Sequence, residues 1–239
     1  MKYNKTYILD ILAIIFLTFI FLFPIYIGGI NDEEGLRVPI LSTKLVLSSW
    51  QNLSYNFWTN RLGLGIPLPF SHDLTMHPLS MLFLSDDFYL PVSFFYTFHI
   101  LIGVFSIYLL CKQFNIDRVV SLVCVFTFLF SSASVQYVHG GFNPTLLVGW
   151  TTFPLLLLIY IKILNAKDSK HSFLMSILLG YIGGFWILNS ALGTTFVHVL
   201  GLLFFTIFCI KDAISKYKYI IISLVIVLLV SADKIYLIL

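Results

Sequence analysis

The chain has 239 residues, of which 59% are hydrophobic and only 10% are charged, and its formal net charge is +3. Soluble domains carry about 25% charged residues, so this composition excludes a water-soluble globular protein of this size. The small positive charge gives no reason to expect nucleic-acid binding. The three cysteines lie in or at the ends of apolar runs, which excludes a disulfide framework. The composition therefore predicts an integral membrane protein.

A helix needs about 20 mostly apolar residues to cross the hydrocarbon core of a bilayer. Seven stretches meet or nearly meet this requirement. They cover residues 7–30, 91–111, 119–138, 144–164, 172–190, 192–210 and 219–239. The first stretch is too long for the apolar region of a signal peptide, so we expect a retained span. The prediction is an all-α integral membrane protein of about seven transmembrane helices, forming one domain over residues 1–239.

The basic residues predict an orientation. With the N-terminus in the cytoplasm, ten of the fourteen Lys and Arg residues fall on the cytoplasmic side, and the short outer loops have none. The ten are Lys2, Lys5, Lys112, Arg118, Lys162, Lys167, Lys170, Lys211, Lys216 and Lys218. We therefore expect a cytoplasmic N-terminus and a last helix that ends outside. Asp10 should lie close enough to the cytoplasmic face to be solvated.

Residues 31–90 form the long first loop, which this topology places on the non-cytoplasmic side. The loop holds six of the eleven acidic residues: Asp32, Glu33, Glu34, Asp73, Asp86 and Asp87. Apolar residues recur every three to five positions from Val38 to Trp58, which predicts an amphipathic helix on the membrane surface. The glycines and prolines that follow Arg61 predict an irregular segment after that helix.

Four residues of this loop are candidates for chemistry. Asp32 and Glu33 follow the first span directly, where a carboxylate can accept a proton or hold a divalent cation; the alternative is a solvated helix end. Arg61 stands beside glycines that let a phosphate approach, and the alternative is a solvated loop arginine. Asp73 is a second acid or a structural contact, because the His-x4-His spacing around it matches no zinc site.

Two further candidates lie on the outer side at membrane depth. His139, in the connection between the third and fourth spans, either lines a cavity or is an interfacial histidine with its hydrogen bonds satisfied. Asp233 and Lys234 fall within the last apolar run, where ionisable groups are costly. They either face a cavity or neutralise each other near the interface.

The layout resembles the GT-C superfamily of membrane glycosyltransferases, and more closely the YfhO-like and arabinofuranosyl- or mannosyltransferase-like bacterial membrane proteins. The resemblance runs over about residues 1–165. It rests on Trp50-Gln-Asn-Leu-Ser, Phe57-Trp58, Arg61-Leu-Gly-Leu-Gly-Ile-Pro, His77-Pro78-Leu79, His139, Asn143-Pro144, Trp150 and Pro154. Members of this family commonly continue with more helices, so we expect a fragment or a reduced member.

The resemblance implies a multi-pass enzyme of the bacterial cytoplasmic (inner) membrane that serves the cell envelope. Such an enzyme transfers a sugar from a polyprenyl-phosphate donor to a non-cytoplasmic acceptor. By position, Asp32 would be the catalytic base, with Glu33 as the alternative and Asp73 as a second acid. Arg61, or a divalent cation such as Mg or Mn, would stabilise the leaving phosphate. Two other functions stay open: a transporter or flippase for lipid-linked substrates, for which the sequence indicates no internal repeat or broken helix, and a non-catalytic membrane subunit.

Overall fold

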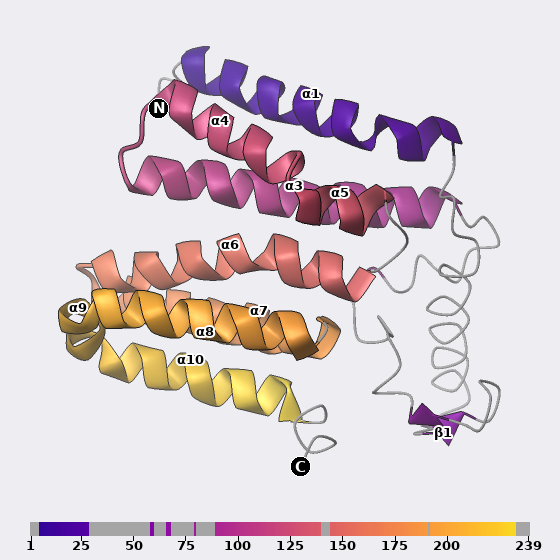
Figure 1. Cartoon of the computed structure of the whole chain (residues 1–239). Helices are drawn as coiled ribbons and strands as arrows, with labels where there is room; N and C mark the ends of the chain where they lie inside the picture. The colour runs from indigo at the N-terminus through magenta and orange to yellow at the C-terminus, as the bar shows by residue number, and fades with distance from the viewer. Residues whose placement is uncertain are drawn as a thin grey trace.

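The computed structural model describes residues 5–28, 58–59, 66–67, 79, 89–139, 144–190 and 192–232, and nearly all of them are helical. The helices are α1 (Lys5–Gly28), α3 (Tyr89–Gln113), α4 (Arg118–Leu129), α5 (Ser132–His139), α6 (Pro144–Asn165), α7 (Ser169–Asn189), α8 (Leu192–Phe208), α9 (Ile210–Ser215) and α10 (Tyr217–Val230). They form a bundle of roughly antiparallel helices (Figure 1).

Four of the described helices, α1, α3, α6 and α7, are long and apolar enough to cross a membrane. The α4–α5 pair is apolar enough to count as a fifth span, broken by a bend of 44°. The helices α8 and α10 are also apolar but shorter, at 17 and 14 residues. These helices make the chain a multi-pass integral membrane protein, as the composition predicts.

Two short strands lie in the segment between α1 and α3. They are β1 (Trp58–Thr59) and β2 (Ile66–Pro67), which pair antiparallel with Trp58 opposite Pro67. Trp58, expected as the last residue of the amphipathic surface helix, therefore lies in a strand. The rest of that expected helix, from Val38 onward, is outside the described residues.

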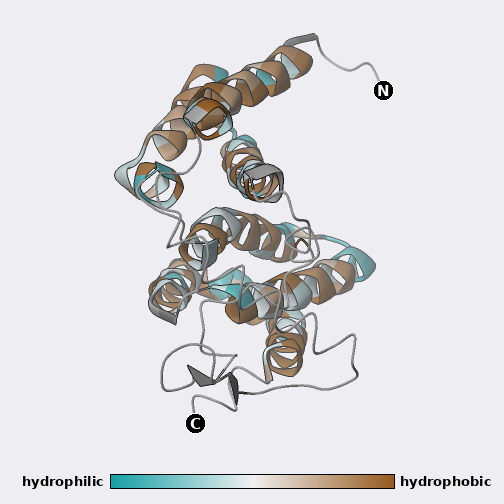
Figure 2. Ribbon diagram, turned by 90° about the vertical axis from the view of Figure 1, so that its right-hand side faces the viewer, coloured by the Kyte–Doolittle hydropathy of each residue, from teal (hydrophilic) through white to brown (hydrophobic). Residues whose placement is uncertain are grey.

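The outward-facing side chains of the bundle are apolar. Phe16, Ile27 and Phe204 are all more than 60% exposed. Brown, which marks hydrophobic residues, predominates along the helices (Figure 2). Water would not tolerate so continuous an apolar exterior on a monomer, whereas lipid tails would. The exposed surface is therefore suited to contact with the lipid tails of a membrane.

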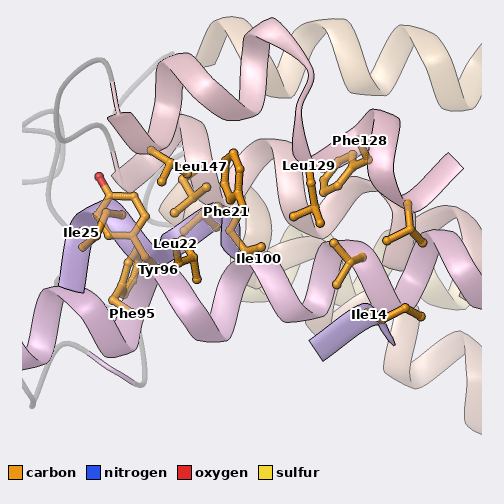
Figure 3. Packing of buried hydrophobic residues seen from close by; sticks show 14 of the residues in the cluster. Ile14, Phe21, Leu22, Ile25, Phe95, Tyr96, Ile100, Phe128, Leu129 and Leu147 are labelled. Atoms are coloured by element: carbon orange, nitrogen blue, oxygen red, sulfur yellow. The ribbon is translucent and has the colours of Figure 1, made fainter. Parts of the chain in front are cut away.

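The main core lies between α1, α3, α4, α5 and α6 (Figure 3). Tyr96 and Ile100 of α3 are completely buried there, against Leu22 of α1 and Leu147 of α6. Tyr96, Tyr108 and Phe95, the largest fully buried side chains among the described residues, all lie in this core. Such close packing matters because lipid offers no hydrophobic drive for helix association.

A tight turn joins α3 to α4. Asn115 has a φ of 55°, and the amide of Ile116 bonds the carbonyl oxygen of Cys111 at 2.9 Å. This is the left-handed helix ending that asparagine tolerates well. Asp117 then caps α4, because its carboxylate accepts a hydrogen bond from the amide of Val119 at 2.8 Å. The turn satisfies the exposed backbone groups at both helix ends within four residues.

The helices α7 and α10 touch through glycines of α7. A Cβ built on Gly180 would lie 2.5 Å from Cβ of Ile226, and one on Gly184 would lie 2.6 Å from Cβ of Val230. Both contacts are far shorter than a real Cβ permits, so the missing side chains are what lets the two backbones approach. Small residues at a helix interface are the usual means of close packing in membranes.

The charges of the described residues gather at one end of the bundle, which we call the basic end: the start of α1, the α3–α4 turn, the α6–α7 turn and the α8–α9–α10 corner. All the described Lys and Arg residues lie there: Lys5, Lys112, Arg118, Lys162, Lys167, Lys170, Lys211, Lys216 and Lys218. The described acids Asp10, Asp117, Asp168 and Asp212 lie at the same end. The opposite end, which we call the loop end, adjoins the 29–88 segment and has no charged residue among those described (Figure 1).

The glycine contacts yield a prediction. Gly180→Ala should destabilise the protein by about 1–3 kcal/mol relative to Gly193→Ala, because overpacking forces the neighbours to shift. Gly193 is the control, since a Cβ there would meet nothing within 4 Å. Thermal unfolding in detergent measures the difference, and equal midpoints for the two variants would contradict the packing described.

Candidate functional site

Most of the residues that the sequence singled out lie outside the described part of the chain. Asp32, Glu33, Arg61 and Asp73 fall in the 29–88 segment, and Asp233 and Lys234 follow the last described residue. The structure therefore places only His139 among the predicted site residues. The other polar groups discussed below were not singled out from the sequence as sites.

Asp10 is buried, and the expectation that it is solvated is wrong. Its side chain lies on α1 with only 2% of its surface exposed. Tyr108 of α3 donates a hydrogen bond from Oη to one carboxylate oxygen at 2.6 Å, and Arg118 of α4 donates from Nε to the other at 2.5 Å. The ammonium of Lys112 lies 5.3 Å from the centre of the Tyr108 ring. A carboxylate at this position joins three helices at the basic end.

The Asp10 cluster was missed because its members are 98 and 108 residues apart in sequence. The signal that was available is the acidic residue itself within an apolar run, since a buried charge in a membrane helix calls for a partner. Both carboxylate oxygens are bonded, and Arg118 is 42% exposed, so the pair sits at the edge of the basic end rather than in the lipid. Nothing in this geometry presents a free acid or base to a substrate.

His139 is the last residue of α5 and lies at the loop end. Its Nε2 is 3.0 Å from the carbonyl oxygen of Phe21, and the Phe21 ring meets the imidazole edge-on with 5.0 Å between ring centres. A carbonyl only accepts, so Nε2 must carry the proton. The contact falls in the turn of α1 that precedes Pro24, where proline removes a helical donor. His139 thus ties α5 to α1 beside the start of the long loop.

The break between α4 and α5 is closed by side-chain hydroxyls. Ser131 Oγ accepts from the amide of Ser134 at 3.2 Å and donates to the carbonyl of Phe128 at 2.9 Å. Ser134 Oγ also donates to that carbonyl at 2.6 Å and accepts from Trp150 Nε1 at 3.0 Å. The indole of Trp150 stacks on Phe128, with 5.5 Å between ring centres. Backbone groups freed at membrane depth need such partners. Trp150 contributes indirectly, through its hydrogen bond to the Ser134 hydroxyl.

A third polar group lies between α6, α7 and α8, toward the loop end. His198 is stacked on Phe153 with 4.4 Å between ring centres and tilted over Trp186, whose Nε1 donates to the carbonyl of Gly149 at 3.3 Å. The buried atoms His198 Nδ1 and Asn189 Oδ1 have no hydrogen-bond partner among the described residues. The contacts with the two aromatic rings fix the position of the imidazole, but they do not determine which of its nitrogens carries the proton.

The described residues hold together a helical scaffold. Among them, no group of three or more His, Cys, Asp or Glu side chains is placed to hold a metal ion. At the loop end they supply His139 and the broken helix.

Comparisons with protein-family models, with curated proteins and with solved structures find no match for this chain. The functional assignment consequently rests on the residues and on the geometry described above.

The Asp10 cluster yields a prediction about stability. Arg118→Ala should cost about 3 kcal/mol, because it leaves a buried carboxylate with Tyr108 as its remaining partner; half-exposure of Arg118 keeps the cost at the low end of the range for buried pairs. Asp10→Asn should cost less, since the freed guanidinium can reach water. Thermal unfolding with the exposed Asp212→Asn as control measures both. An Arg118→Ala midpoint equal to that control would show that the cluster contributes nothing.

Proposed function

We propose that the chain crosses the membrane seven times, with its N-terminus in the cytoplasm and residues 31–90 outside. The spans would be α1, α3, the α4–α5 pair, α6, α7, α8 and α10. The support is the separation of charge along the bundle: all described Lys and Arg residues lie at the basic end, and cytoplasmic ends are the basic ones. The amphipathic surface helix, expected between residues 38 and 58, would lie on the outer leaflet.

On this frame we propose a glycosyltransferase of the GT-C type, acting on a polyprenyl-phosphate sugar at the outer face of a bacterial cytoplasmic membrane. The observation that carries the proposal is the placement of the loop. Helix α1 ends and α3 begins at the loop end, where no described residue is charged, so the acidic 31–90 segment attaches where a membrane-embedded donor meets water. Six of the eleven acidic residues belong to that segment.

The proposed reaction follows from the chemistry of the loop residues. Asp32, with Glu33 as the alternative, accepts the proton of the acceptor hydroxyl while that oxygen forms a bond to the anomeric carbon of the sugar. The bond from this carbon to the lipid phosphate breaks, and the electron pair leaves with the phosphate. Arg61, or a divalent cation held by the acids including Asp73, stabilises the negative charge on the leaving group.

One observation favours a second function, a flippase for lipid-linked substrates. The α4–α5 pair is a broken span, and discontinuous helices are common where transporters bind their substrates. Against this, the hydroxyls of Ser131 and Ser134 bond backbone groups of the break internally, and Trp150 Nε1 donates to the Ser134 hydroxyl. Glycosyl transfer therefore remains the leading proposal, and the activity measurement in proteoliposomes distinguishes it from lipid flipping.

The topology is tested with single cysteines in a variant without the three native ones. Gly193→Cys, exposed at the loop end, should react with a membrane-impermeant thiol reagent added to intact cells. Ser215→Cys, exposed at the basic end, should react after permeabilisation and not before. The reverse pattern, or equal labelling of both positions, would overturn the proposed orientation.

The activity is tested in proteoliposomes loaded with a polyprenyl-phosphate sugar and an acceptor glycan. Asp32→Asn should lower transfer by about 100-fold or more, because general acid–base groups contribute this much, with unchanged insertion and abundance. Glu34→Gln is the matched control in the same acidic run and should retain activity.

Two results decide against parts of the proposal. Full transfer by both Asp32→Asn and Glu33→Gln would remove the site assignment. Movement of the lipid-linked sugar between leaflets by the wild type, without any transfer, would establish the flippase instead of the enzyme.

A further inference from the structure

A cavity of about 310 Å³ lies between α6, α7, α8 and α10. Its inner wall is formed by buried residues, among them Leu156 of α6 and Gly183 and Trp186 of α7. Its rim is formed by Leu203 of α8 and Leu224 of α10, which are 54% and 55% exposed. The cavity therefore opens sideways, between α8 and α10, toward the surrounding lipid. Its volume is at the lower bound for small-molecule sites.

The hydroxyl groups of the lining already donate their protons within the protein. Tyr160 Oη and Thr206 Oγ1 bond each other at 3.0 Å, and Thr206 also donates to the carbonyl of Leu202. Ser223 Oγ bonds the carbonyls of Ser176 and Tyr219, both at 3.0 Å. A buried water needs about two to four partners, and most of the lining residues are apolar, so the cavity suits an apolar occupant.

Exposed lysines lie near the basic end of the groove on both sides. On α10, Tyr217 comes seven residues before Leu224, which places the two on one helical face, and Lys218 follows Tyr217. On the other side, α8 ends at Phe208, and Lys211 is the second residue of the next helix, α9. Both lysines are exposed, and the Lys218 ammonium lies 5.9 Å from the centre of the Tyr217 ring. Cationic groups thus flank the basic end of the groove on both sides.

The depth of the cavity matches one leaflet. Val227, at the inner limit of the lining on α10, lies nine residues beyond Lys218, which corresponds to about 14 Å along the helix. Half of a bilayer's hydrocarbon core is about 15 Å thick. A chain that starts beside Lys218 and runs along the groove therefore reaches Val227 at about the bilayer midplane.

We propose that the groove between α8 and α10 binds one anionic phospholipid from the leaflet at the basic end. One acyl chain lies in the cavity, and the phosphate lies between Lys211 and Lys218. Anionic lipids concentrate at the cytoplasmic leaflet and gain about 1 kcal/mol for each nearby Lys or Arg, or about fivefold in affinity. The site depends on the membrane-spanning arrangement and is independent of glycosyl transfer at the other end.

The direct test is native mass spectrometry of the full chain released from nanodiscs that contain equal amounts of phosphatidylglycerol and phosphatidylcholine. The wild type should retain one lipid, with phosphatidylglycerol enriched at least fivefold. The Lys211→Gln/Lys218→Gln variant should lose this enrichment, whereas Lys162→Gln/Lys170→Gln, with two lysines removed from the same end, should keep it. Equal retention of both lipids by the wild type, or unchanged enrichment in the first variant, would overturn the headgroup assignment.

The acyl chain is tested separately. Leu203→Trp fills the groove from its exposed rim and should abolish lipid retention. Phe204→Trp, at the next position of α8 and 62% exposed away from the lining, should keep it. Similar retention by the two variants would overturn the placement of the chain, as would recovery of a polyprenyl phosphate instead of a phospholipid.

A second measurement does not depend on the folding of Leu203→Trp. Trp186 lines the cavity, so phosphatidylglycerol brominated in mid-chain should quench the part of the fluorescence that Trp186→Phe removes. Brominated phosphatidylcholine should quench that part several-fold less. Equal quenching by the two lipids would contradict a site selective for anionic lipid.

Discussion

The constraint on which this structure depends is that hydrocarbon offers neither hydrogen bonds nor a charged partner. Every backbone group at membrane depth must be bonded inside the protein, and every charge must reach an end of the bundle or a partner. The long helices satisfy the first demand. The gathering of the described charges at the basic end satisfies the second. Among the described carboxylates only Asp10 is buried in the bundle, with Tyr108 and Arg118 bonded to it.

The same constraint explains how the irregular parts are built. Where α4 breaks before α5, the hydroxyls of Ser131 and Ser134 bond backbone groups of the break, and the indole of Trp150 donates to the Ser134 hydroxyl. Where Pro24 interrupts α1, His139 bonds a carbonyl of the preceding turn. Polar residues that look like site candidates in the sequence thus have structural partners in the bundle.

The two ends of the molecule have different proposed roles. At the loop end the bundle has no described charge, so the acidic segment beside it supplies the chemistry of the proposed transfer. At the basic end the α8–α10 groove combines an apolar cavity with flanking lysines, which is the combination that an anionic phospholipid matches. The glycines of α7 that admit α10 also shape one wall of this cavity, through Gly183.

The amino-acid sequence by itself determined the class of protein and the positions of the helices, because hydrophobicity over some 20 residues is a local property and lipid is the only solvent that it suits. Only the tertiary structure decided the partners. The sequence suggested that Asp10 is solvated. Its hydrogen-bond partners, Tyr108 of α3 and Arg118 of α4, lie about a hundred residues further along the chain. The sequence predicted neither the bend between α4 and α5 nor the α8–α10 groove. Both depend on which helix faces pack together, and a run of apolar residues does not show which helix it will pack against.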